Sequence, residues 1–281
     1  MASDAPVWVR ASAGCVGALM ASVFGFILIC ALGALMEDGG PALTGLVWQP
    51  DAGRFGILPM IWGTLLLSCS SLAMGWLLAV GTACFLNGLG PRWAAALLMG
   101  LIRFMTAIPT VFYGFASVFL LTPLIRNGLG GSGLCWLSAS LVLSLQILPS
   151  MTLTMDGAMR LAAAETWLTA EALGLSQEQN LAWVALPACR KGLISAAMLG
   201  FGRAAGDTLI PTMLAGNAVQ IAKSPLDALR TLTAHIGLVT SSDVSGQAYS
   251  SLFLAGGILL LVSASASLIV RGLSSRKGNL S

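Results

Sequence analysis

Long runs of apolar residues, separated by short polar segments, dominate the chain. A helix that crosses a bilayer needs about 20 mostly apolar residues, and six runs reach or approach that length. Glycine is frequent inside them, which membrane helices tolerate because small residues let neighbouring backbones approach closely. The pattern therefore predicts an all-α integral membrane protein with six membrane-spanning helices, at about 11–36, 58–86, 93–121, 134–148, 186–214 and 249–270.

The composition supports this class and excludes others. Only 9% of the 281 residues are charged and 57% are apolar, whereas about 25% are charged in ordinary soluble domains. A soluble domain could not cover its surface with so few charges, which excludes a cytosolic enzyme, a disordered chain and a nucleic-acid-binding protein, despite the net charge of +3. The scattered cysteines form no CxxC pair, and we interpret them as small core residues: Cys15, Cys30, Cys69, Cys84, Cys135 and Cys189.

The distribution of basic residues predicts the orientation. Lys and Arg are enriched in cytoplasmic loops of membrane proteins. Eight of the 14 lie on the side that holds the termini, four lie on the other side, and Arg103 and Arg203 fall inside predicted spans. We therefore expect both termini in the cytoplasm. The first apolar run is too long for the core of a cleaved signal peptide, and we expect it to be retained.

Two long connections suggest how the chain is organised. One, at about 150–185, lies on the predicted cytoplasmic side, and the other, at about 215–248, lies outside. We divide the chain into an N-terminal helix with its outer loop, 1–57, and a core, 58–281, that contains the cytoplasmic connection. His235, the only histidine, falls in the outer connection, and we interpret it as a surface or docking residue rather than a ligand.

The cytoplasmic segment 171–187 carries the clearest local pattern. Gly174 fits the left-handed residue that ends one helix, and Ser176 with Gln179 forms a capping box at the start of the next. Pro187 suits the first turn of a helix, where its missing N–H has no partner anyway. A polar helix pair at a membrane surface suits contact with a soluble partner. The residues expected to anchor the second helix are Leu181 and Trp183.

This segment resembles the cytoplasmic EAA loop of ABC-importer permeases. In that loop a glycine is followed at a fixed distance by an aliphatic residue and Leu-Pro. Here Gly174 is followed ten positions later by Val184, and then by Leu-Pro at 186–187. The family's glutamate is replaced by Leu168, and Glu171 is expected to substitute on the same helix face. The resemblance implies that this loop docks on an ATPase through Glu171, Ala172, Gly174, Leu186 and Pro187.

Two predicted spans are similar to the permease subunits of phosphate importers of the Pst type. Residues 202–208 read Gly-Arg-Ala-Ala-Gly-Asp-Thr, where that family has Gly-Arg-Ala-x-Gly-Glu-Thr, and residues 108–114 read Ile-Pro-Thr-Val-Phe-Tyr-Gly, similar to Ile-Pro-Ser-x-x-Tyr-Gly. Residues 61–67 also look like the start of the family's core. The similarity covers most of residues 60–270.

Three charged residues fall inside predicted spans, where each costs about 2.5–3.5 kcal/mol on insertion scales. Arg203 and Asp207 are four residues apart and could form a self-compensating pair on one helix face. Alternatively, the Arg203 guanidinium offers paired donors to the oxygens of an anion. Arg103 stands where the phosphate permeases have an acid, and it could pair with Asp207 or extend to the interface. These alternatives stay open.

Proline and glycine mark further candidate positions. Pro109 should kink the third span and free carbonyl oxygens such as that of Met105, to which Tyr113 could add a hydroxyl, although Tyr113 could equally pack. Gly202 and Gly206 could admit a neighbouring helix or the substrate. The candidate substrate path is thus Arg203, Asp207, Arg103 and Tyr113, and the candidate hinge and packing residues are Pro109, Gly202 and Gly206.

The resemblance implies the type I ABC-importer (MetI-like) core in a bacterial inner membrane. It implies a second permease subunit of the same or a different kind, two ABC ATPase subunits that bind ATP and Mg, an external phosphate-binding protein and contact with membrane lipid. The chain itself has no Walker A sequence and no metal-ligand motif, so we expect no catalytic residues, no metal and no cofactor of its own.

Several alternatives to a phosphate permease remain. Arg103 leaves open a permease for molybdate, tungstate or sulfate, and a passive channel or a regulatory membrane anchor is a more distant possibility. The subunit type is also open, because Asn217 after Gly216 favours the C-type phosphate permease and residues 231–236 favour the A-type.

Overall fold

The computed structural model describes residues 6–241 and 247–275, and most of them are helical. Two short strands, β1 (Trp48–Gln49) and β2 (Arg54–Phe55), pair antiparallel in a small hairpin around the turn η1 (Pro50–Ala52). The predicted all-α class is confirmed. The helical elements are α1 (Val7–Thr44), α2 (Leu58–Cys84), η2 (Phe85–Leu89), α3 (Arg92–Ala107), α4 (Thr110–Leu129), α5 (Trp136–Ala172), α6 (Gln177–Gln179), η3 (Asn180–Ala185), α7 (Leu186–Ala188), α8 (Arg190–Gly206), α9 (Leu209–Leu214), α10 (Leu232–Thr240) and α11 (Gln247–Ser275).

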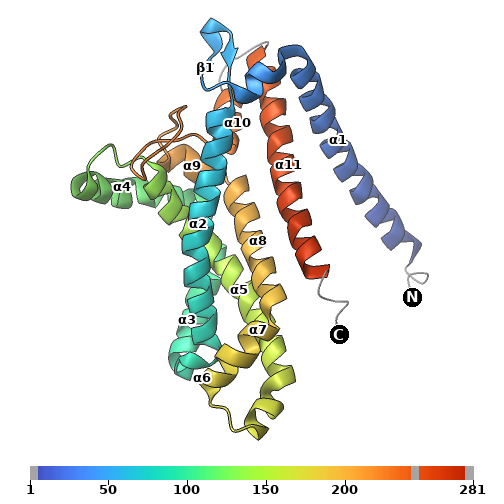
Figure 1. Ribbon diagram of the computed structural model, residues 1–281, viewed down its shortest axis with the longest axis vertical. Helices are drawn as coiled ribbons and strands as arrows, with labels where there is room; N and C mark the ends of the chain where they lie inside the picture. Colours follow the sequence, from blue (N-terminus) through green and yellow to red (C-terminus); the bar gives the residue numbers. More distant parts are fainter. Residues whose placement is uncertain (1–5, 242–246, 276–281) are drawn as a thin grey trace.

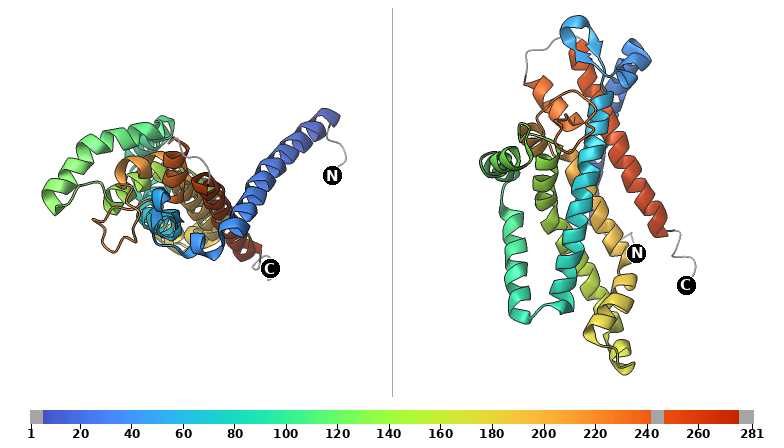
Figure 2. Two further views of the ribbon diagram at one scale, coloured as in Figure 1. Left: turned by 90° about the horizontal axis from the view of Figure 1, so that it is seen from above. Right: turned by 60° about the vertical axis from the view of Figure 1, so that its left-hand side comes forward.

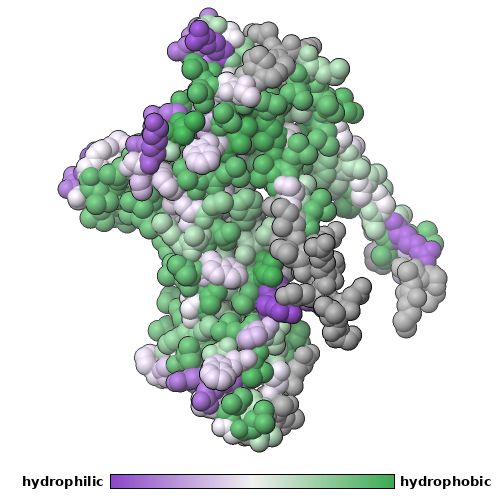
Figure 3. All heavy atoms as spheres, in the orientation of Figure 1, coloured by the Kyte–Doolittle hydropathy of each residue, from purple (hydrophilic) through white to green (hydrophobic). Residues whose placement is uncertain are grey.

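The helices form an elongated bundle with polar ends. In Figure 1 the β1–β2 hairpin and α10 lie at the upper end, and α6 and α7 lie at the lower end. Hydrophobic residues cover most of the middle of the face shown in Figure 3, and hydrophilic residues gather mainly towards the ends. This distribution is that of a protein whose middle zone lies in lipid.

Within the described residues, three helices are long and apolar enough to cross a membrane, in the ranges 7–36, 58–89 and 136–163. Two bent pairs raise this number to as many as five: α3 with α4, bent by 101°, and the segment Gln177–Ala188 with α8, bent by 69°. The apolar part of α11, Ser251–Ser265, is shorter. The exact number of six spans stays a prediction.

Three predicted spans differ in extent or continuity from the helices that contain them. The third span, 93–121, is two helices almost at right angles, because Ile108 and Pro109 are extended. The fourth, 134–148, was too short, because α5 continues as one helix of 37 residues to Ala172. The fifth, 186–214, begins with a bend at Cys189 and is interrupted at Asp207.

The core lies where α2, α5 and α8 pack around one another. A stripe of fully buried residues at four-residue spacing runs along α5: Leu143, Ile147, Met151, Met155 and Met159. Gly75 of α2 lies against Ile147, and Gly200 of α8 lies so close to Met151 that a Cβ has no room. This stripe extends the buried part of α5 well beyond the predicted span.

Helix α1 stands apart from this core. Only 6% of its apolar window is buried, and Figure 1 and the left view of Figure 2 show it leaning away from the bundle. The α1–α11 contact includes an edge-to-face pair of Phe26 and Phe253, with ring centroids 5.9 Å apart. Most of the α1 surface is therefore available to lipid or to another subunit.

His235 is buried at the upper end, so its interpretation as a surface residue was wrong. The turn into α10 places it beneath the hairpin, where its ring meets that of Trp48 edge to face with centroids 4.4 Å apart. Neither ring nitrogen has a hydrogen-bond partner among the described residues. A buried ring without partners is most stable in its neutral form.

Acid should therefore destabilise the upper end of the molecule. Burial, assisted by the nearby Arg230 charge, lowers the pKa of His235 to about 4, whereas an unfolded histidine titrates near 6.5. As the pH falls, the unfolded chain therefore binds the proton before the folded chain does. The contribution of His235 to the free energy of unfolding is fully present above about pH 6.5 and is lost as the pH drops towards 4. Lowering the pH from 7 to 5 should reduce the free energy of unfolding by about 2 kcal/mol through this histidine.

Thermal unfolding in detergent at these two pH values measures the effect. A His235→Phe variant keeps an aromatic ring against Trp48 and should lose this part of the pH dependence. An unchanged pH dependence in the variant would assign the effect to other groups.

Candidate functional site

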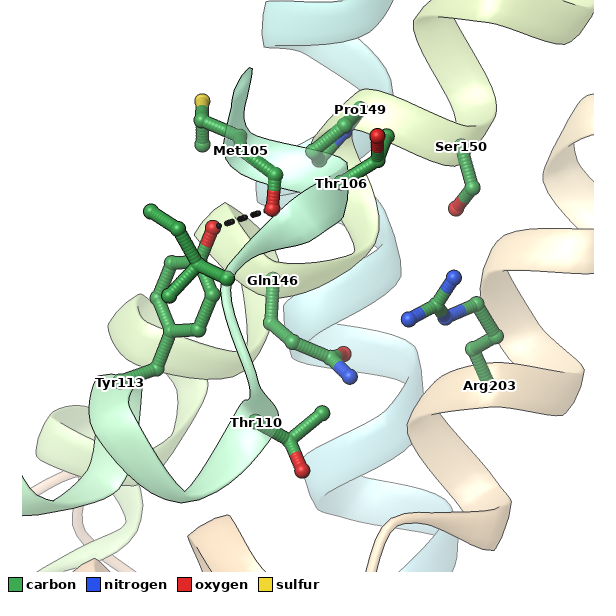
Figure 4. A pocket seen from close by; sticks show the side chains of 9 residues that line it. Met105, Thr106, Thr110, Tyr113, Gln146, Pro149, Ser150 and Arg203 are labelled. Carbon is green, nitrogen blue, oxygen red and sulfur yellow. Dashed lines mark hydrogen bonds between the residues drawn. The ribbon is translucent and has the colours of Figure 1, made fainter. Parts of the chain in front are cut away.

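The break between α3 and α4 is the first part of the site. Proline has no N–H, and it pushes the preceding residue out of the helical region, so Ile108 and Pro109 are both extended, with ψ of 125° and 141°. The predicted kink at Pro109 is confirmed and amounts to a full break. The Tyr113 hydroxyl donates to the Met105 carbonyl oxygen at 3.0 Å, which ties α4 back to the end of α3 (Figure 4).

The interruption between α8 and α9 is the second part. Asp207 is extended, with ψ of 131°, and its Oδ1 accepts a hydrogen bond from the Ile210 N–H at 2.9 Å. Its Oδ2 lies 3.4 Å from Gln146 Nε2 on α5, and the Thr233 hydroxyl donates to its backbone carbonyl at 2.7 Å. The carboxylate therefore accepts a hydrogen bond from the first turn of α9, as a helix-capping residue does.

The interpretation of Arg203 and Asp207 as a pair on one helix face was wrong. Helix α8 ends at Gly206, between the two residues. Within the described ranges, the structure contains no ion pair between them, and the one ion pair that it does contain joins Arg160 to Asp156. Arg203 is also without a hydrogen bond to any described residue, so its guanidinium donors are free.

Arg203 points into a pocket that the two interruptions create. In Figure 4 its guanidinium projects from α8 towards Gln146 and Ser150 of α5, across from Tyr113. The pocket volume is about 20 Å³, which suits about one water molecule. The Oε1 atom of Gln146 is buried there without a partner among the described groups. The pocket is lined by Met105, Thr106, Ile108, Thr110, Tyr113, Gln146, Pro149, Ser150 and Arg203.

Arg103 is not part of this pocket. It lies exposed on α3, and it forms no ion pair with Asp207 or with any other acidic residue in the described part of the chain. The suggested pairing of Arg103 with Asp207 was therefore wrong, and extension of this side chain towards an interface remains.

The packing glycines of α8 are also different from those predicted. A Cβ at Gly202 or Gly206 would meet no described atom within 4 Å, so neither glycine packs closely against another helix in the described part of the chain. Both are exposed near Arg203 and leave that side of α8 open. The tight contacts are instead at Gly192, against Ala158, and at Gly200. The missed signal was in the sequence: small residues recur every fourth position at Gly192, Ala196, Gly200 and Ala204.

The cytoplasmic segment has the local structure that its sequence predicts. Gly174 has a φ of +68°, and both bonds of the capping box are present: Gln179 N–H donates to Ser176 Oγ at 3.2 Å, and Ser176 N–H donates to Gln179 Oε1 at 2.9 Å. Leu181 is buried, as predicted for an anchor, but Trp183 is 77% exposed, so its prediction as an anchor was wrong.

The remaining predicted docking residues lie at the two ends of this segment. Ala172 ends α5 next to Glu171, whose side chain lies outside the described part of the structure. The stretch Gln177–Ala188 is helical throughout, with Leu186 and Pro187 at the start of α7, and then bends into α8. It lies at the end of the bundle opposite the hairpin (Figure 1), where a soluble partner can reach it.

Comparison with known proteins agrees with this architecture. Residues 75–279 match the family described as binding-protein-dependent transport system inner membrane component. The chain is 32% identical over 239 residues to a probable ABC transporter permease protein, YqgH, of Bacillus subtilis, covering 84% of this chain and 77% of that protein. It is 28% identical over 249 residues to the phosphate transport system permease protein PstC of Mesorhizobium japonicum, covering 82% and 76%.

A solved structure shows the same fold. An inward-facing conformation of the MetNI methionine ABC transporter matches with a TM-score of 0.59 and 18% identity, covering 80% of this chain and 99% of that chain. At this identity the likeness concerns the fold alone, and it confirms the predicted MetI-like core. The matched family region, the relatives and the fold lead to one conclusion: the chain belongs to the family of inner-membrane components of binding-protein-dependent transport systems.

Proposed function

We propose that this chain is a permease subunit of an ATP-driven importer that moves inorganic phosphate into the cytoplasm by alternating access. The observation that carries the proposal is Arg203, which has no hydrogen bond or ion pair with the described residues and points into a polar pocket between two interrupted helices. Relatives from several bacteria are named phosphate transport system permease protein PstC, and they support phosphate as the substrate.

The chemistry of the pocket suits a tetrahedral oxyanion. A guanidinium presents paired N–H donors to two oxygens. Thr106, Thr110 and Ser150 line the same space, and the hydroxyls of Thr106 and Ser150 donate to backbone carbonyls. A pocket of about 20 Å³ is too small for the anion, so transport requires it to widen as the bundle moves between two states. The broken backbone at Pro109 and Asp207 is where such a movement needs the least rearrangement of helix hydrogen bonds.

The proposed importer contains further subunits. A second permease subunit completes the path, two ABC ATPase subunits bind ATP and Mg, and an external binding protein delivers the anion. The helical segment Gln177–Ala188, with Trp183 exposed on it, is the docking element for an ATPase. The excess of Lys and Arg on the side of the termini supports cytoplasmic termini in a bacterial inner membrane.

Reconstitution tests the proposal. The complex that co-purifies with this chain from membranes is placed in proteoliposomes, and uptake of radiolabelled phosphate is measured with and without ATP. We expect uptake that depends on ATP and is not reduced by excess molybdate or sulfate. Loss of phosphate uptake in the presence of molybdate would assign the path to a different oxyanion, and uptake without ATP would indicate a channel.

A further inference from the structure

Three segments that are far apart in the sequence meet at the lower end of the bundle. They are the turn between α2 and α3, which contains η2, the middle of α5, and the start of the segment Gln177–Ala188. Figure 1 shows α6 beside the lower ends of α2 and α3. The contacts that join these segments involve Asn87, Gly88, Asp156 and Gln177, none of which belongs to the pocket around Arg203.

A hydrogen bond locks the turn to α5. Asn87 Nδ2 donates to Asp156 Oδ1 at 2.8 Å and to the Ala83 carbonyl oxygen at 2.9 Å. Asp156 is only 6% exposed, and a buried carboxylate needs partners that offset the loss of water. Its other partner, Arg160 at 3.0 Å, has a side chain that is 62% exposed, and an ion pair so open to solvent contributes little. Asn87 is itself part-buried, so its amide is the less exposed of the two partners.

The next residue of the turn touches the docking segment. Gly88 has a φ of +146°, and a Cβ at this position would lie 2.9 Å from Gln177 Nε2. The Gln177 side chain thus rests directly on the Gly88 backbone. Glycine meets both demands, because it adopts positive φ without strain and lets another group approach its backbone closely.

We infer that this turn is a positioning element that carries movement of the segment Gln177–Ala188 to α2 and α5, an inference that rests on the proposed transport function. Along the chain, the segment is connected to α8 through the 69° bend at Cys189. A displacement of the segment can change this bend angle without moving α8. Displacement passes between elements through rigid packed contacts. Gln177 on Gly88 and Asn87 on Asp156 form a second route that bypasses the bend.

The inference is tested by the number of phosphate ions imported per ATP hydrolysed in proteoliposomes. In Asn87→Ala we expect ATP hydrolysis to continue while this ratio falls about tenfold, since a hydrogen bond to a buried charge is lost. Gly88→Ala should lower the ratio in the same direction, because the side chain strains the turn and displaces Gln177. This second variant keeps Asn87 and the Asp156 hydrogen bond intact if Asn87→Ala fails to fold.

A matched control joins the middle of α2 to the first turns of α5, away from the turn that contains η2. Ser70 of α2 forms hydrogen bonds of 2.8 Å with Ser140 Oγ and with Trp136 Nε1 of α5. Ser70→Ala should reduce the thermal stability of the complex and leave the ratio of phosphate to ATP unchanged. A wild-type ratio in Asn87→Ala, or an equal fall in Ser70→Ala, would overturn the inference. Absence of ATP-driven phosphate uptake by the wild-type complex would instead overturn the proposed function.

Discussion

An Arg203→Gln permease should insert and assemble normally but import phosphate about 100-fold more slowly, because two hydrogen bonds from a charged donor to the anion are lost. Glutamine keeps a polar side chain of moderate length but has no charge and no forked donor pair. Assembly should be preserved because Arg203 has no hydrogen bond or ion pair with the described residues. Uptake of radiolabelled phosphate, with membrane levels of the complex measured in parallel, gives the result.

Two variants control this experiment. Arg203→Lys keeps the charge without the paired donors and should give uptake between those of the wild type and Arg203→Gln. Arg103→Gln removes an arginine that is exposed on α3 and outside the pocket, and its uptake should stay near the wild-type rate. Normal uptake by a correctly inserted Arg203→Gln protein would reduce Arg203 to a structural role.

A Gly174→Val permease should retain less than about one tenth of ATP-driven uptake. The φ of +68° at this position strains a β-branched residue by about 1–3 kcal/mol. A Cβ there would meet no atom of the described residues within 4 Å, so the expected effect comes from the backbone conformation. The strain is relieved when the turn changes, and the segment that follows it then points in another direction. Uptake and ATPase co-purification are measured together.

Asparagine provides the matched comparison at the same position. It adopts left-handed conformations more readily than other residues with a side chain, so Gly174→Asn should keep most of the uptake. If Gly174→Val has unaltered ATP-dependent uptake, the turn is not required for coupling and the proposed role of the cytoplasmic segment is lost.

Features determined by neighbouring residues were predictable from the sequence. Apolar runs predicted membrane helices, and Pro109 predicted the break between α3 and α4 because its effect on the helix is covalent. The turn at Gly174 and the capping box of Ser176 and Gln179 depend on bonds that span three residues or fewer. The general class of the fold and the local structure of residues 174–188 followed from these local patterns.

Features determined by distant residues were not predictable in the same way. The interruption at Asp207 has a local cause in Pro211, which has no N–H to donate to the carbonyl four residues earlier. The hydrogen bond from Thr233 to that same carbonyl, 26 residues away, has no local pattern. The face of the docking segment that is buried depends on α5, which is why Leu181 is an anchor and Trp183 is not. The hydrogen bond from Asn87 to Asp156 joins residues 69 positions apart, and no local sequence pattern predicts it.

The unequal lengths of neighbouring helices have a consequence for the surrounding bilayer. Helix α2 has 27 residues and α3 has 16, so they are about 40 Å and 24 Å long, beside a hydrocarbon layer of about 30 Å. Where α3 ends, α4 turns by 101° and exposes Phe112, Phe115 and Phe119, as helices that lie along an interface do. We expect lipid that contacts α3 to be thinner than lipid beside α2, and such hydrophobic mismatch should make transport sensitive to the acyl-chain length of the host membrane.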